Sequence, residues 1–109
     1  GSSGINQALD LQLEIFEDYV KKCLEIKPQI TQKHIERIME PLDICIDIML
    51  ENDDGESEKQ KTWFKLFDRI LMFELNICSK FKANPKLDIA VNAIDELLEK
   101  LLYSMVRSV

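Results

Sequence analysis

Apolar residues recur at helical spacing in four consecutive segments of the chain. In the last segment they step by four, three, four, three and four residues, at Leu87, Val91, Ile94, Leu98, Leu101 and Met105. This spacing places side chains on one face of an α-helix, whereas a half-buried strand has a period of two. Similar stripes earlier in the chain predict an all-α protein with helices over residues 5–26, 31–51, 57–82 and 85–106.

Local signals mark where the predicted helices begin and end. Lys27-Pro28 ends the first helix, because proline disfavours helical geometry in the residue before it. Thr31 is a good N-cap for the second helix, and Ser57 with Gln60 forms a capping box for the third. Asn84-Pro85 then opens the fourth. Because the connections are short, we predict a four-helix antiparallel up-down bundle.

Pro41 falls inside the second apolar stripe, which comprises Ile35, Ile38, Leu42, Cys45 and Met49. Proline removes one backbone hydrogen bond and clashes with the preceding turn, so the helix is expected to be kinked or broken there. The stripe continues across Pro41, which favours the kink.

The first and third segments carry more apolar residues than one packing seam requires. In the first, the seam is Leu9, Leu13, Phe16, Val20 and Leu24, and a second apolar set lies on another side at Leu11, Ile15 and Tyr19. The third holds five of the eight aromatic residues, so we predict it to be the most buried helix. A helix that is apolar on two sides is either central in the bundle or touches a partner.

The length of 109 residues suits one domain, which we place at residues 5–107. Residues 1–4, Gly-Ser-Ser-Gly, are interpreted as a cloning remnant or a disordered leader. Three cysteines, an odd number, lie in three different predicted helices, which favours reduced thiols over a disulfide scaffold. With no signal peptide and no apolar run long enough to span a membrane, an intracellular protein, cytoplasmic or nuclear, is expected.

Residue patterns typical of catalysis or metal binding are missing from the sequence. His34 is the only histidine and has no cysteine at metal-ligand spacing. Gly55 is the only glycine after the leader, so no phosphate-binding loop can form. An EF-hand centred on Gly55 would need ligands at Leu50 and Lys61, which cannot bind calcium. We therefore predict a protein that is not an enzyme, with no catalytic residue, metal or cofactor.

Acidic residues form a row along one face of the second predicted helix. The net charge is −6 overall and −7 within residues 1–54. The row comprises Glu36, Glu40, Asp43 and Asp47. It is interpreted as a solvated face or as a docking surface for a basic partner. An acidic domain is repelled by phosphate backbones, which makes nucleic acid an unlikely partner.

Residues 59–86 are locally basic, with seven lysines and arginines against two acids. Lys61, Lys65 and Arg69 repeat every four residues along one side of the third predicted helix. Such a row is typical of surfaces that bind nucleic acid or anionic membranes. It is equally consistent with a solvated row, or with a row that faces the acids of the second helix inside the bundle.

These observations favour a non-catalytic protein–protein interaction module, such as a scaffold, an adaptor or a subunit of a eukaryotic regulatory complex. The expected partner is another protein that supplies an amphipathic helix or a basic segment. It would dock on Leu11, Ile15 and Tyr19 or on the acidic row, and homodimerisation through the same face is a variant. The alternative function is binding of nucleic acid or anionic membrane through the basic row.

Overall fold

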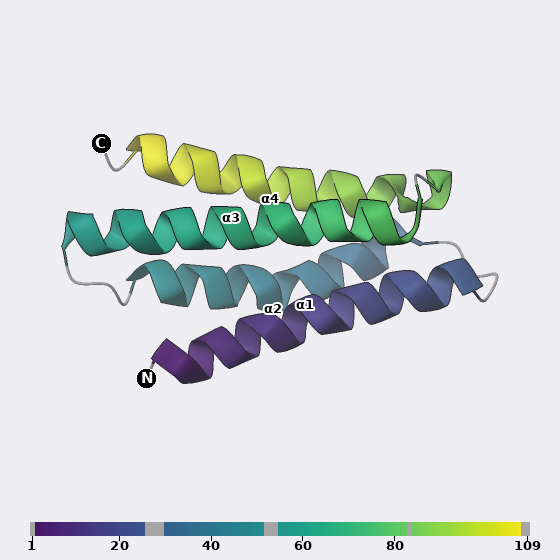
Figure 1. Cartoon of the computed structure of the whole chain (residues 1–109), viewed down its shortest axis with the longest axis horizontal. Coiled ribbons are helices and arrows are strands. Elements are labelled where there is room, and N and C mark those ends of the chain that lie inside the picture. The colour runs from purple at the N-terminus through teal and green to yellow at the C-terminus, as the bar shows by residue number, and fades with distance from the viewer. Residues whose placement is uncertain (1, 26–29, 52–54, 83, 108–109) are drawn as a thin grey trace.

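The computed structural model describes residues 2–25, 30–51, 55–82 and 84–107. They form four α-helices: α1 (Ser2–Glu25), α2 (Gln32–Glu51), α3 (Glu56–Lys80) and α4 (Asp88–Arg107), the last preceded by a short 3-10 helix, η1 (Pro85–Leu87). The helices run side by side in alternating directions (Figure 1). The predicted all-α four-helix antiparallel bundle is confirmed.

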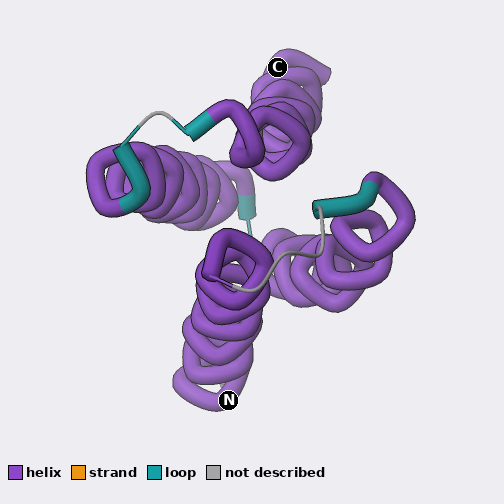
Figure 2. Tube along the Cα trace, turned by 90° about the vertical axis from the view of Figure 1, so that its right-hand side faces the viewer, coloured by secondary structure: helices purple, strands orange, loops and turns teal. Residues whose placement is uncertain are grey.

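Two helical hairpins make up the bundle. Viewed end-on, the four helices occupy four corners (Figure 2), with α1 packed on α2 and α3 packed on α4. Ion pairs link the hairpins, from Asp10 and Glu17 of α1 to Arg69 and Lys80 of α3. From the first pair to the second, the residue number rises on both α1 and α3. The two helices are therefore parallel, as expected because alternate helices of an antiparallel up-down bundle point the same way.

The core is entirely apolar among the described residues, with no buried polar or charged side chain. Its largest fully buried members come from all four helices and include Phe16, Ile35, Ile70 and Ile94. The predicted seam of α1 is confirmed from Leu9 to Val20. The predicted stripe that runs from Leu87 of η1 along α4 is buried except at Val91 and Met105, which are partly buried. Ala90, Ala93 and Leu97 widen the packed face of α4.

The packed face of α2 is rotated from the predicted stripe. Its buried residues are Ile35, Met39, Leu42 and Ile46. Ile38, Cys45 and Met49, which we predicted in the seam, are only half-buried at its edge. Both sets have helical spacing, and α2 packs on α3 and α4 as well as α1, so its neighbours decide which set is central.

The prediction that the third helix is the most buried is wrong. Only Trp63, Leu66, Ile70 and Ile77 of α3 are buried, whereas Phe64, Met72 and Leu75 are among the exposed large hydrophobics. A helix at a corner of a bundle buries one stripe, and the apolar residues of α3 extend around more of its circumference than that.

Two of the predicted helix starts are confirmed at their caps. Thr31 Oγ1 accepts a hydrogen bond from the His34 backbone N–H at 3.3 Å, and Asn84 Oδ1 accepts one from Lys86 at 3.0 Å. The predicted capping box of Ser57 and Gln60 is wrong, because α3 begins at Glu56 and no side chain caps it. Its N-cap is Gly55 at φ 84°, a left-handed backbone angle that glycine adopts without strain.

Helix α2 runs unbroken through Pro41, and its ribbon bends near the middle (Figure 1). This resolves the predicted alternative of a kink or a break in favour of a continuous helix. Helix α1 begins at Ser2, so leader residues 2–4 are helical rather than disordered. Extending a formed helix needs no new nucleation, which accounts for the earlier start. The expected end of the first helix at Lys27-Pro28 lies outside the described residues.

A core truncation compared with a surface truncation one turn away tests this packing. Leu98 of α4 is 8% exposed and Leu102 is 46% exposed. We expect Leu98→Ala to lower the free energy of unfolding by roughly 2–5 kcal/mol, because it leaves a cavity in the core. Leu102→Ala should cost less than about 1 kcal/mol. Urea denaturation followed by circular dichroism measures both, and equal losses would contradict the described packing of α4.

Candidate functional site

Among the residues that the structure describes, nine large hydrophobic side chains are at least 39% exposed, and several of them recur at helical spacing. They are Leu11, Ile15, Ile44, Ile48, Phe64, Met72, Leu75, Leu102 and Tyr103. Several pairs recur at helical spacing, such as Leu11 with Ile15 and Ile44 with Ile48. Contiguous exposed apolar surface of this kind marks interaction sites on soluble proteins.

The outer side of the α1–α2 hairpin carries the first of these surfaces. Leu11 is 54% exposed and Ile15 is 42% exposed, so the second apolar set of α1 lies largely outside the core. Tyr19 is different: its ring packs edge-on against His34 of α2, with centroids 6.1 Å apart. Burial, followed by the nearby Cys23 thiol, raises the pKa of Tyr19. Tyr19 therefore belongs mainly to the contact between α1 and α2.

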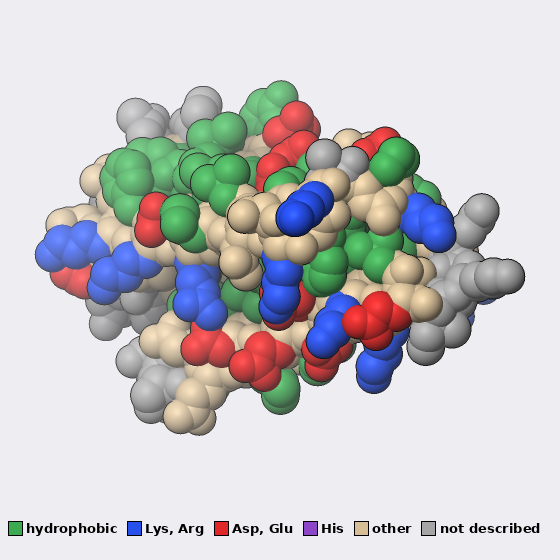
Figure 3. Space-filling model, turned by 45° about the vertical axis from the view of Figure 1, so that its right-hand side comes forward, with side chains coloured by type: hydrophobic (Ala, Val, Ile, Leu, Met, Phe, Trp, Pro, Cys, Tyr) green, Lys and Arg blue, Asp and Glu red, His purple; other side chains and the backbone are tan. Residues whose placement is uncertain are grey.

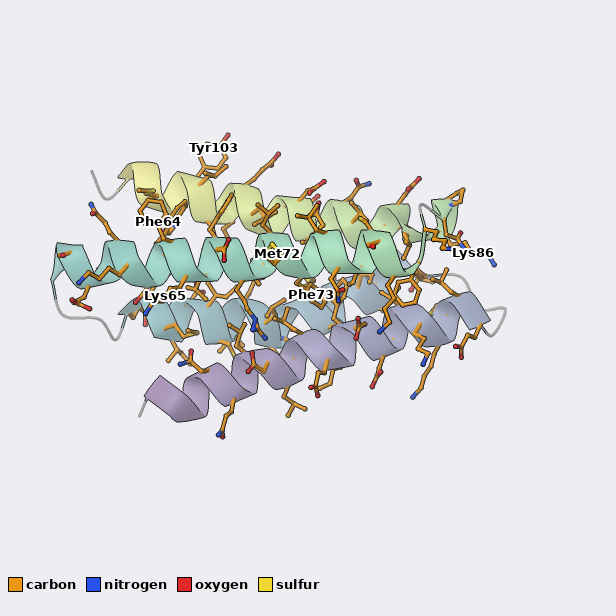
Figure 4. The ribbon with its side chains drawn as sticks, viewed as in Figure 1. Phe64, Lys65, Met72, Phe73, Lys86 and Tyr103 are labelled. Carbon is orange, nitrogen blue, oxygen red and sulfur yellow. The ribbon has the colours of Figure 1, made fainter. Side chains whose placement is uncertain are left out.

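A second surface covers the outer side of the α3–α4 hairpin. We call it the α3–α4 face; it comprises Phe64, Asp68, Leu71 and Leu75 on α3 and Val91, Asp95 and Leu102 on α4, with the core residue Leu98 buried beneath it in the α4 row. Each row advances by four, three and four residues, which keeps its members on one side of their helix. Hydrophobic side chains gather over α3 and α4 in Figure 3, and Phe64 projects from the α4 side of α3 in Figure 4.

Glu74 lies between these two rows, with its carboxyl half-buried beside Asp95. Its Oε2 atom is buried and has no hydrogen-bond partner among the described residues. Burial, and next the neighbouring Asp95, raises the pKa of Glu74 to about 7. The pKa of the Cys78 thiol is also raised, first by burial and then by Glu74 and Asp95. A raised pKa disfavours the reactive thiolate, so this arrangement does not resemble a nucleophilic site.

The acidic row of α2 lines a separate groove against α4. The groove has a volume of about 390 Å³, and its acidic lining includes Glu36, Glu40 and Asp43. Lys100 of α4 reaches across it and pairs with Asp43 at 3.3 Å and Asp47 at 3.8 Å. The structure thus brings the acids together but separates them from Leu11 and Ile15, which project from α1.

In the basic row of α3, Arg69 contacts an acid of α1, and no member forms an ion pair with the acids of α2 among the described residues. Arg69 pairs with Asp10 of α1, and Lys61 pairs within its own helix with Glu58 at 3.3 Å. Lys65 is exposed and has no ion-pair partner in the part of the chain that the structure describes. Figure 3 shows the row of Lys and Arg side chains above acidic side chains. The sequence-based alternative that this row meets the acidic row of α2 is wrong.

Comparison with known proteins finds no matching family model, no matching curated protein and no matching solved structure. No described helix is long and apolar enough to cross a membrane. Within the described residues, His, Cys, Asp and Glu side chains form no group of three or more that could hold a metal ion.

Sequence reasoning missed several residues of the exposed surfaces. Ile44 and Ile48 were overlooked because the second segment was treated as carrying only a narrow seam. The sequence does contain a pattern that indicates the α3–α4 face. Apolar residues recur at helical spacing from Phe64 to Cys78, and Asp68 interrupts them. The approach of Glu74 to Asp95 joins two helices, and no local sequence pattern indicates it.

We expect Glu74 to make the stability of the fold depend on pH. The folded chain keeps this proton up to about pH 7, whereas the unfolded chain loses it near pH 4.5. Between these values the folded state binds more protons, so the contribution of Glu74 to stability falls as pH rises. Glu74→Gln should remove this loss and increase stability at pH 8 relative to the parent.

Urea denaturation at pH 5, 6, 7 and 8 measures the effect. Glu99→Gln is the matched control, since it removes one negative charge from the exposed side of α4. It should keep the pH dependence of the parent. If Glu74→Gln keeps that dependence as well, the described environment of Glu74 is wrong.

Proposed function

We propose that this chain is a non-catalytic protein–protein interaction module that binds a partner's helix on apolar faces left outside its core. The observation that carries the proposal is the exposure of large hydrophobic residues at helical spacing on both hairpins. An amphipathic helix is the natural occupant, because its residues at i, i+3, i+4 and i+7 match such rows.

The free energies of burial and association indicate that a binding site needs a row of exposed apolar residues rather than a single one. Burying one leucine, isoleucine or phenylalanine side chain contributes roughly 1.5–3 kcal/mol. Association costs on the order of 4–15 kcal/mol in lost freedom of motion. One exposed leucine is therefore not sufficient, whereas three or four anchors together with polar contacts offset the cost.

The proposed setting is a scaffold, an adaptor or a subunit of a eukaryotic regulatory complex in the cytoplasm or nucleus. The free cysteines Cys23, Cys45 and Cys78 support a reducing compartment. The face around Leu11 and Ile15 is one docking surface, and a second copy of the chain is the variant occupant.

The acidic groove of α2 offers a second type of contact to a basic partner segment. Lys100 already pairs with Asp43 and Asp47. Glu36 and Glu40 make no ion pair within the described residues, although Gln32 donates a hydrogen bond to Glu36 at 3.3 Å. These two glutamates are thus the members of the predicted row that are open to a partner cation.

Binding of nucleic acid or anionic membrane through the basic row remains the alternative. Exposed Lys65 supports it, whereas the pairing of Lys61 and Arg69 with acids weakens it. The double variant Lys61→Glu and Lys65→Glu separates the two functions. It should abolish salt-sensitive nucleic-acid binding if the alternative holds, and leave binding of a protein partner intact if the module function holds.

Site-specific photocrosslinking in the cells that make the protein tests the module function. We expect a photoreactive residue in place of Ile15 or Leu75 to form covalent adducts with another protein chain. The matched controls replace Glu14 and Asn76, exposed neighbours that point to other sides of the same helices. Absence of adducts from both test positions, or equal adducts from their controls, would contradict the proposal.

A further inference from the structure

The α3–α4 face combines an apolar strip with negative charge. Phe64 and Leu75 are 58% and 53% exposed, and Leu102 of α4 is also largely exposed. Phe64 and Leu75 are eleven residues apart, a distance of about 16 Å along a helix. The strip therefore matches about three turns of a partner helix.

Acids interrupt and border this strip, and no cation neutralises them. Asp68 stands within the α3 row, Asp95 within the α4 row, and Glu99 one turn beyond Asp95. Together with Glu74 they take part in no ion pair among the described residues. By contrast, Asp10 and Glu17 of α1 are paired with cations of α3.

The two long edges of α3 therefore differ in chemistry. Lys65 and Phe73 project toward α1, and Phe64 projects toward α4 (Figure 4). The α1 edge has its basic row next to acids of α1, whereas the α4 edge has apolar residues and uncompensated acids.

The negative charge of this strip determines which kind of partner can bind to it. Two copies of the chain placed face to face would bring Asp68, Asp95 and Glu99 of each copy together, and like charges repel. Phosphate groups of nucleic acid or lipid would be repelled for the same reason. A helix with a stripe of apolar residues flanked by lysine or arginine is complementary in both shape and charge.

We infer that the α3–α4 face binds a basic amphipathic helix of a partner protein. Its apolar residues lie on Phe64, Leu75 and Leu102, and its basic residues pair with the exposed acids Asp68, Asp95 and Glu99. This inference rests on the proposed function and adds the site and the chemistry of the partner.

Synthetic helices test the inference directly with the full chain. The probe is an 18-residue fluorescent peptide with leucines at i, i+3, i+4 and i+7 and lysines on both flanks. Two control peptides are a scrambled sequence of the same composition and a version with glutamate flanks. Fluorescence anisotropy at 150 mM salt should show saturable binding of the probe, with both controls at least tenfold weaker.

Variants of the chain then locate the binding surface. Leu75→Ser with Leu102→Ser should weaken binding of the probe at least tenfold. Asp68→Asn with Asp95→Asn should also weaken it and reduce its dependence on salt. The matched control, Glu36→Gln with Glu40→Gln, removes the same charge from α2 and should keep the affinity of the parent. Circular dichroism and thermal unfolding confirm that each variant is folded.

Three results would overturn the inference. The first is equal loss of affinity from the two charge-neutralising pairs, which would mean that binding follows net charge alone. The second is unchanged affinity in the Leu75→Ser, Leu102→Ser variant. The third is a dimer in sedimentation velocity that this variant converts to a monomer, which would assign the face to a second copy. After either of the first two results, protein adducts at position 15 would preserve the proposed function, and absence of adducts at both positions 15 and 75 would contradict it too. The third result would leave the proposed function standing, with a second copy of the chain as the occupant.

Discussion

The structure depends on the burial of one apolar stripe from each of four amphipathic helices. A helix in such a bundle can turn only part of its circumference toward the core. The buried side chains are all apolar among the described residues. Further apolar residues either pack at the edges of the core, as Ile38 and Phe67 do, or lie as a surplus on the outside, as Leu11 and Phe64 do. The surfaces proposed to bind partners are this surplus.

Electrostatics distinguishes the surfaces that the bundle uses from those that it leaves open. Ion pairs cross from α1 to α3 and from α2 to α4, where exposed acids and bases lie within 4 Å of each other. Such exposed pairs contribute little stability, but they compensate charge locally. On the α3–α4 face, Asp68 and Asp95 take part in no ion pair among the described residues, and the proposed preference for a basic partner rests on this difference.

The sequence predicts what depends on local patterns and misses what depends on neighbours. Helical spacing and the caps at Thr31 and Asn84 identify the helices because their causes lie within a few residues. The burial of Met39 and Ile46 rather than Ile38 and Cys45 is decided by how α2 sits against three helices. The same limit applies to α3, whose aromatic content indicates burial although its corner position exposes Phe64. Leu11 and Ile15 can be predicted from the sequence because they lie on a different side of the first helix from its seam.

The central claim is that the exposed apolar rows serve binding and are not needed for folding. The most direct test is the free energy of unfolding of a triple variant, Phe64→Ser, Leu75→Ser and Leu102→Ser, compared with the parent by urea denaturation. The account predicts a change within about 1 kcal/mol, because these side chains are exposed in the folded chain. A loss of several kcal/mol, comparable to truncating a core leucine, would show that the rows are part of the fold and would contradict the account.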